Sequence, residues 1–189
     1  MSFGLWLAAT VGMLAVRAPH IRRSLSIKVA RSRESRLDRA LVALVGAGLL
    51  LPWLTVFDAS VGPVRLAAGA AAFGFGLCLL HRSHVDLGRN WSNTLELREQ
   101  HTLVTHGVYR HVRHPMYTAL LLHGVGQALV LRSPLAGPAF LLAMFALVLT
   151  RLAKEERLMR DAFGDVYVRY CERTSRLVPG LALKTRSSQ

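Results

Sequence analysis

Apolar residues in this chain gather into five long stretches, which polar and basic segments separate. The stretches run over Phe3–Val16, Ala40–Phe57, Val64–Leu80, Met116–Leu131 and Leu135–Leu152. Each approaches the roughly 20 residues that an α-helix needs to cross the hydrocarbon layer of a membrane. The pattern therefore predicts an all-α integral membrane protein with five transmembrane helices.

The fourth and fifth stretches are separated by a very short connection, Arg132-Ser133-Pro134. A connection of this length predicts two helices that lie side by side and antiparallel. We therefore expect the last two spans to form a tight helical hairpin.

Composition agrees with a membrane location. The 189 residues are 52% hydrophobic, with a mean hydropathy of +0.32 and a formal net charge of +13. A soluble globular domain would carry more mixed charge, and a disordered chain would lack the aliphatic residues. The two cysteines lie in unlike surroundings, so no disulfide framework is expected.

Basic residues predict the orientation of the spans. Of the 24 Lys and Arg residues, 22 fall in the segments 17–39, 82–113 and 151–186. With five spans these segments share one side of the membrane, which the positive-inside rule makes the cytoplasm. The N-terminus is then outside and the C-terminus cytoplasmic, and we expect the inner membrane of a bacterium. Anionic lipid headgroups account for the charge, and no nucleic-acid partner is expected.

Polar chemistry concentrates in the predicted cytoplasmic segment 81–117. It holds six of the eight histidines and ends in Arg113-His114-Pro115-Met116-Tyr117. Pro115 suits the first turn of a helix, which places His114 beside exposed backbone donors that favour an anionic group. The histidine spacings match neither HExxH nor a structural zinc pattern, so no metal site is expected.

A second concentration lies where the fifth span leaves the membrane. Arg151 and Glu155 are four residues apart and share one helix face, whereas Glu156 is rotated by about 100°. Arg151 and Glu155 could serve a ligand pocket, with the Glu155 carboxylate holding hydroxyl or amino groups and the Arg151 guanidinium binding an anion. A solvated ion pair is the alternative. His123 and Gln127, within the fourth span, are either functional or bonded between helices.

Three blocks of sequence, taken together, resemble the isoprenylcysteine carboxyl methyltransferase family. The first block is Leu87–Ser92 followed by His101–Tyr109, and the second is Arg113–Tyr117. The third is Glu155–Leu158 with Phe163–Tyr167 and the closing segment Tyr170–Pro179. The blocks extend over about half of the chain.

The resemblance implies an integral membrane enzyme that uses S-adenosylmethionine to methylate a carboxylate. It implies a cytoplasmic cofactor pocket, with a lipophilic carboxylate substrate entering from the bilayer. Arg151 would be the catalytic and substrate-binding residue that orients this carboxylate. The implied cofactor contacts are Thr94, His101, Leu103, Val104, Tyr109, His114, Pro115, Met116, Tyr117 and Glu155.

We thus expect an N-terminal transmembrane region, 1–86, and a catalytic region, 87–189. The expected activity is O-methylation of an isoprenylated cysteine or a similar lipophilic acid. A phospholipid amine N-methyltransferase, a reductase that uses NADPH on the related sterol reductase fold, and a transporter or non-catalytic membrane subunit are the alternatives. The natural acceptor and the oligomeric state stay open.

Overall fold

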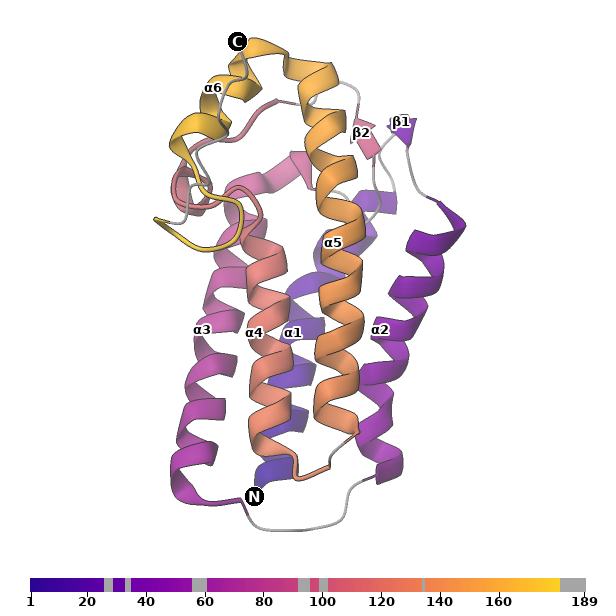
Figure 1. The fold of residues 1–189 in the computed structure, drawn as a ribbon, viewed down its shortest axis with the longest axis vertical. Coiled ribbons are helices and arrows are strands. Elements are labelled where there is room, and N and C mark those ends of the chain that lie inside the picture. The colour runs from indigo at the N-terminus through magenta and orange to yellow at the C-terminus, as the bar shows by residue number, and fades with distance from the viewer. Residues whose placement is uncertain are drawn as a thin grey trace.

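The described residues form a bundle of five long helices, with a smaller cap at one end (Figure 1). The computed structural model describes residues 1–25, 29–32, 35–55, 61–91, 96–98, 102–133 and 135–180. The bundle helices are α1 (Ser2–Leu25), α2 (Arg36–Thr55), α3 (Pro63–Leu87), α4 (Pro115–Val130) and α5 (Ala136–Phe163). The N-terminus lies at the end of the bundle opposite the cap (Figure 1).

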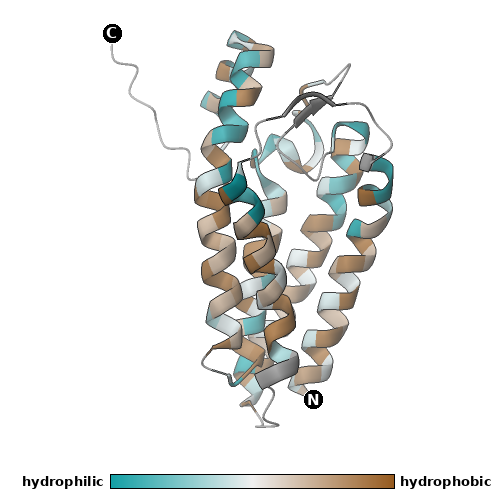
Figure 2. Cartoon of the chain, turned by 90° about the vertical axis from the view of Figure 1, so that its right-hand side faces the viewer, coloured by the Kyte–Doolittle hydropathy of each residue, from teal (hydrophilic) through white to brown (hydrophobic). Residues whose placement is uncertain are grey.

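Hydrophobic residues predominate in the middle of the bundle, and hydrophilic residues gather at the cap end (Figure 2). Three segments in the described part of the chain are long and apolar enough to cross a membrane: Ser2–Arg23, Pro63–Asn90 and Ala136–Phe163. Large apolar side chains also point outward, among them Leu50, Phe75 and Leu142. An outward apolar band of this kind suits lipid rather than water.

Helix ends extend beyond the apolar stretches that predicted them. Helix α1 continues to Leu25 instead of ending at Val16, and α5 continues to Phe163 instead of Leu152. Arginine and lysine are good helix formers, so a basic segment marks the edge of the lipid and not the end of the helix. Two glycines with positive φ, Gly88 and Gly164, end α3 and α5.

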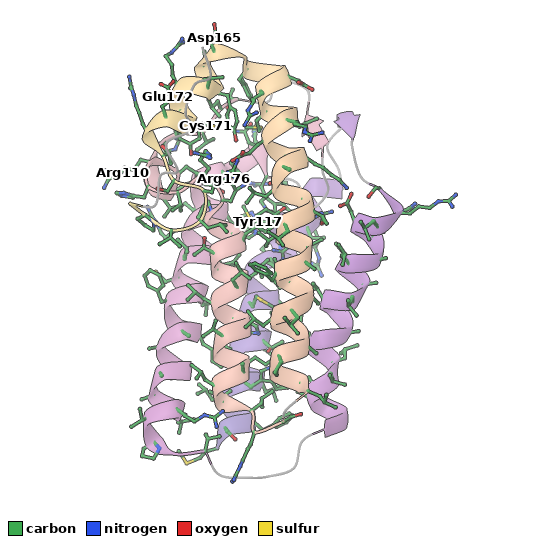
Figure 3. The ribbon with its side chains drawn as sticks, viewed as in Figure 1. Arg110, Tyr117, Asp165, Cys171, Glu172 and Arg176 are labelled. Carbon is green, nitrogen blue, oxygen red and sulfur yellow. The ribbon has the colours of Figure 1, made fainter. Side chains whose placement is uncertain are left out.

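The cap consists of short elements at the end of the bundle that carries the polar residues. These are β1 (Val29–Ser32), η1 (Gly88–Asn90), β2 (Glu96–Arg98), η2 (Gly107–Arg110) and α6 (Asp165–Arg173). Strands β1 and β2 pair antiparallel, a small addition to the predicted all-helical fold. Figure 3 labels Asp165 and Glu172 on α6, and Tyr117 lower down, where the cap meets the bundle.

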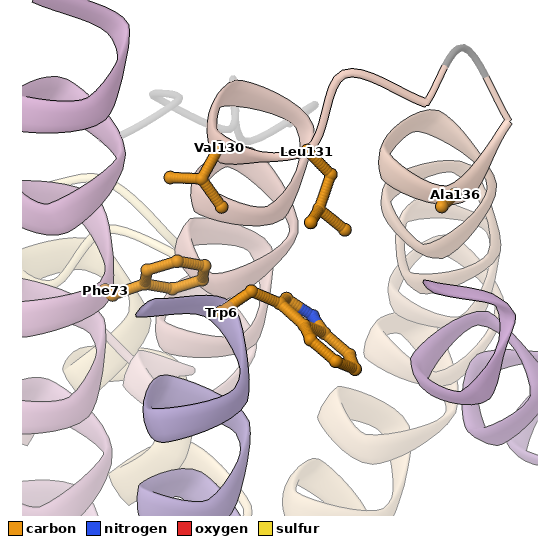
Figure 4. Close-up of a cluster of buried hydrophobic side chains, with 5 residues drawn as sticks. All are labelled: Trp6, Phe73, Val130, Leu131 and Ala136. Carbon is orange, nitrogen blue, oxygen red and sulfur yellow. The ribbon is translucent and has the colours of Figure 1, made fainter. Parts of the chain in front are cut away.

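Small residues bring the bundle helices into close contact. A Cβ atom at Gly137 would lie 2.5 Å from Ala128 Cα, and one at Gly48 would lie 2.9 Å from Phe140 Cα. Glycine is therefore required where α5 meets α4 and where α2 meets α5. Near the end of the bundle away from the cap, a cluster of buried apolar side chains fills the interior (Figure 4): Trp6, Phe73, Val130, Leu131 and Ala136.

The fully buried Gln127 side chain bonds four helices together. Trp6 Nε1 donates to Gln127 Oε1 at 2.9 Å, joining α1 to α4. Gln127 Nε2 donates to the backbone oxygens of Ala136 in α5, at 2.7 Å, and Gly48 in α2, at 3.2 Å. His123 lies 3.4 Å from the Thr10 hydroxyl of α1. Of the two roles left open for these residues, the structure supports interhelical bonding.

A capping box fastens the cap end of α2 to α5. Ser35 N donates to Asp38 Oδ2 at 2.8 Å, and Asp38 N donates to Ser35 Oγ at 3.2 Å. Lys154 Nζ then donates to Asp38 Oδ2 at 2.7 Å. Burial by itself raises the pKa of Asp38, but the bonds from Lys154 and Ser35 outweigh burial and lower it to about 2. This contact fixes α2 beside the polar part of α5.

Candidate active site

A cavity of about 400 Å³ lies between the bundle helices and reaches into the cap. Its bundle end is lined by apolar residues of three helices, namely Met13 and Leu14 of α1, Val42, Val45, Gly46 and Leu49 of α2, and Phe140, Met144 and Leu147 of α5. Its cap end is lined mainly by residues that precede or begin α4. One cavity therefore joins an apolar chamber to a polar one.

Helix α5 carries this change of character along a single face. Phe140, Met144, Leu147, Arg151 and Glu155 follow one another at intervals of three or four residues, and all line the cavity. Such spacing keeps side chains on one side of a helix. Apolar side chains thus face the bundle end, Arg151 lies at the change, and Glu155 faces the cap end.

The structure brings most of the expected site residues into this cavity. The lining includes Leu103, Val104, Tyr109, His114, Pro115, Met116, Tyr117, Arg151 and Glu155. Thr94 and His101, the other two expected contacts, lie outside the described residues. Residues separated by about 50 positions in the chain therefore share one chamber.

Glu155 is the single acidic residue among the described residues that line the cavity. The Tyr117 hydroxyl donates to Glu155 Oε1. His114 Nδ1 lies 3.4 Å from Glu155 Oε2, and the Glu155 side chain is 30% exposed. The carboxylate is thus oriented by two neighbours while part of it still faces open space.

His114 is placed between two carboxylates at the start of α4. Its Nε2 atom lies 3.6 Å from Glu156 Oε1, and its side chain is 9% exposed. Burial by itself would lower the pKa of His114, but Glu155 and Glu156 outweigh burial and raise the pKa above its ordinary value. The structure therefore favours a protonated imidazole in this chamber.

Arg151 is buried, with an exposure of 7%. A solvated surface pair was the alternative reading of Arg151 and Glu155, and this degree of burial argues against it. A buried guanidinium beside an open cavity is well suited to hold an anionic ligand group, because its planar donors match a carboxylate.

Glu156 has different neighbours from Glu155, as the rotation between adjacent helical positions requires. Arg113 Nη2 donates to Glu156 Oε1, and Arg176 Nη2 donates to Glu156 Oε2, each at 2.9 Å. Glu156 is 2% exposed. This buried cluster joins α5 to the segment before α4 and to the C-terminal segment. Apart from the charges themselves, no sequence pattern predicted it.

The C-terminal segment runs along the residues that begin α4. Arg113 N donates to Ser175 O at 2.8 Å, and His114 N donates to Arg176 O at 3.0 Å. The Thr118 hydroxyl donates to Leu177 O at 2.7 Å. These bonds fix the backbone at His114, so its ring position does not depend on its own side-chain contacts alone.

The cavity lining also includes Arg17, Asn90 and Trp91, which were not among the expected contacts. The Arg17 guanidinium lies 5.8 Å from the centre of the Trp91 ring, a cation–π contact. The Asn90 amide bonds both the hydroxyl and the backbone N–H of Thr102, each at 2.9 Å. Asn90 thereby positions the wall that continues into Leu103.

Tyr109 closes the cavity on the side of α3 and α6. Its side chain is 6% exposed, and the Tyr170 hydroxyl donates to its backbone oxygen at 2.6 Å. Burial raises the pKa of Tyr109 well above its ordinary value, so its ring stays neutral. Helix α6 therefore holds the Tyr109 wall of the cavity in place.

Comparison with known proteins shows which proteins this chain resembles. The sequence model of the isoprenylcysteine carboxyl methyltransferase family matches residues 69–161. The chain is 35% identical over 97 residues to the probable protein-S-isoprenylcysteine O-methyltransferase of Oryza sativa subsp. indica, covering 50% of this chain and 51% of that protein. It is 34% identical over 97 residues to protein-S-isoprenylcysteine O-methyltransferase B of Arabidopsis thaliana, covering 50% and 49%. The chain spans about half the length of these relatives.

The fold is similar to a solved structure as well. The eukaryotic intramembrane Ras methyltransferase, an isoprenylcysteine carboxyl methyltransferase, superposes with a TM-score of 0.62 at 21% identity, covering 96% of this chain and 67% of that one. The molecule is therefore an integral membrane protein that shares the fold of this structure. The chain is thus similar to the isoprenylcysteine carboxyl methyltransferase family in sequence and in fold, which confirms the resemblance carried by its motifs.

Proposed function

We propose that the chain is an S-adenosylmethionine-dependent O-methyltransferase that acts on the carboxylate of an isoprenylated cysteine or a similar lipophilic acid. The observation that carries this proposal is the continuous cavity, apolar within the bundle and polar within the cap, with Arg151 at the junction. A lipophilic tail and a polar methyl donor need adjoining chambers of these two kinds. The family relationship supports the same reaction class.

The residues of the polar chamber fit S-adenosylmethionine. Glu155 offers a carboxylate for an ammonium or for ribose hydroxyls, and Tyr109 and Trp91 offer aromatic surface. The proposed binding wall consists of Leu103, Val104, Tyr109, His114, Pro115, Met116, Tyr117 and Glu155, with His101 and Thr94 added by the family resemblance. When bound, S-adenosylmethionine supplies the methyl group: an acceptor oxygen bonds to the methyl carbon, the carbon–sulfur bond breaks, and its electron pair stays on sulfur.

Arg151 is proposed to position the acceptor. A carboxylate with an ordinary pKa near 4 is ionised at neutral pH, so the chain needs no general base. Holding the acceptor oxygen in line with the methyl group can contribute up to about 7–11 kcal/mol of the barrier. The role of Arg151 is then orientation, while the surrounding apolar wall keeps water away.

We further propose that the lipid tail enters between α1 and α2. Leu14 of α1 and Val42 of α2 line the cavity and are 51% and 42% exposed. Gly46, on the same part of α2, also lines the cavity and is exposed. Residues that are open both to the cavity and to the outer surface mark its mouth, and in the proposed orientation this outer surface faces lipid.

All five bundle helices are proposed to cross the membrane, with the cap and the C-terminus cytoplasmic. The N-terminus and the cap lie at opposite ends of the bundle, as this topology requires (Figure 1). Helix α4 has 16 residues and is about 24 Å long, so flanking residues must complete its span. Region 1–86, with the first three spans, is proposed as an N-terminal transmembrane region. Region 87–189, with the motif segments, the last two spans and the C-terminal helix, is proposed as the catalytic region. Both contribute walls to the cavity, so they function as one unit.

The acceptor is tested by transfer of labelled methyl from S-adenosylmethionine in detergent micelles. N-acetyl-S-farnesylcysteine should be labelled, whereas its carboxamide and phosphatidylethanolamine should not. Labelled phosphatidylethanolamine would instead support the amine N-methyltransferase. Arg151→Ala should raise the KM for the acid about tenfold or more and leave the Kd of S-adenosylmethionine unchanged. Loss of cofactor binding in this variant would contradict the positioning role.

A further inference from the structure

Arg17 brings a second guanidinium to the cavity from a helix outside the region matched by the family model. It belongs to α1, and the matched region begins at residue 69. Met13 and Leu14, one turn earlier on α1, line the apolar chamber. Arg17 therefore stands at the same change from apolar to polar lining as Arg151, on a different helix.

The Arg17 side chain is held in place by a rigid neighbour. Its guanidinium lies 5.8 Å from the centre of the Trp91 ring, and Trp91 is 3% exposed. Trp91 Nε1 in turn donates to the Met116 sulfur at 3.0 Å. An arginine near the end of a membrane helix commonly extends to the lipid headgroups, whereas Arg17 is half-buried against a cavity wall.

The described lining of the cavity holds three arginines and one carboxylate. Arg113 is engaged by Glu156, and Glu155 is engaged by Tyr117 and His114. Arg17 and Arg151 interact electrostatically with each other as like charges. The lining therefore carries more positive than negative charge, and an anion placed between Arg17 and Arg151 would be attracted by both.

We propose that Arg17, together with Arg151, binds the carboxylate of the methyl acceptor. The inference rests on the proposed function, because it assigns the acceptor group of the same cavity. It makes α1 part of the binding site and makes the site selective for anionic acceptors over neutral or cationic ones. An amine acceptor would meet two positive charges at this point.

The test compares a carboxylate with its neutral counterpart. Binding of N-acetyl-S-farnesylcysteine and of its carboxamide is measured by calorimetry, in detergent, on protein saturated with S-adenosylhomocysteine. Arg17→Gln should weaken binding of the acid about tenfold or more and change binding of the carboxamide less than about twofold. Arg17→Lys keeps the charge and should retain part of the preference for the acid. Arg22→Gln, an exposed arginine of the same helix, is the matched control and should change neither affinity.

The outcomes separate this inference from the proposed function. An equal loss for acid and carboxamide, or no loss for either, in a variant that still binds S-adenosylhomocysteine would overturn the role of Arg17. If Arg151→Gln loses the acid preference and Arg17→Gln keeps it, the inference fails and the proposed function stands. If the wild type binds the cofactor product but shows no preference for the acid over the carboxamide, the proposed function fails as well.

Discussion

Neighbouring residues in the candidate site have separate tasks because the helix turns them apart. Glu155 faces the cavity with Tyr117 and His114, whereas Glu156 is clamped by Arg113 and Arg176. The two carboxylates differ in surroundings more than in chemistry. The first is available to a ligand, and the second holds the cap on the bundle.

His114 should make stability depend on pH in a defined direction. Its pKa is raised in the folded chain, so its contribution is fully present below about 6.5 and is lost as the pH rises through the higher folded value. The apparent Tm in detergent should therefore fall more steeply above about pH 6.5 in the wild type than in His114→Gln. His81→Gln, an exposed histidine, is the control and should behave like the wild type. Parallel Tm curves for the wild type and His114→Gln would contradict the charge assignment.

Contacts between elements rely on a small number of polar side chains in an apolar bundle. Gln127 joins α1, α2, α4 and α5 through three hydrogen bonds, and Asp38 joins α2 to Lys154 of α5. Water cannot replace such bonds within the apolar part of the bundle. Their loss therefore affects the packing of whole helices.

Gln127→Leu should lower the stability of the bundle. The variant removes three interhelical bonds and leaves the Trp6 N–H without its acceptor, so we expect a loss of about 2 kcal/mol. Thermal unfolding in micelles measures the change. Thr150→Val is the control, because the hydrogen bonds of Thr150 within the described part of the chain go to Ala146 and Leu147 of its own helix. Equal stability of the two variants would show that Gln127 does not join the helices in this way.

The apolar pattern of the sequence predicts the positions of the bundle helices better than their ends. Each of the five apolar stretches overlaps one bundle helix, and three of these helices are long and apolar enough to cross a membrane. The stretches did not show that α1 continues through Arg17 to Leu25, since hydropathy reports the lipid boundary and not hydrogen bonding. At the site, the motifs led to His114, Tyr117 and Glu155. The Arg17–Trp91 contact was beyond reach, because it depends on how α1 packs in three dimensions.

At the scale of the whole molecule, the proposed function depends on one cavity with a lateral mouth between α1 and α2. Gly46 lies at the proposed lateral mouth, and a Cβ there meets no atom within 4 Å. Gly46→Phe should therefore fill the mouth without disturbing the fold. Transfer of methyl to the farnesylated acid should drop about tenfold or more, while the Kd of S-adenosylmethionine stays unchanged.

Gly74 offers the matched control for this prediction. It lies on the outer face of α3, where a Cβ also meets no atom within 4 Å, and it does not line the cavity. Gly74→Phe should keep wild-type transfer. Equal activity of both phenylalanine variants would mean that the acceptor reaches the cavity by another route.

The most direct test of carboxylate methylation in this cavity is the chemical nature of the product. Protein in detergent is incubated with methyl-labelled S-adenosylmethionine and N-acetyl-S-farnesylcysteine, and the extracted lipid is treated with base. In the wild type and in the control Glu172→Ala, we expect labelled lipid whose label is released by base as methanol, as for a methyl ester. In Glu155→Ala, we expect no such label. Base-stable label, or full transfer by Glu155→Ala, would contradict carboxylate methylation in this cavity.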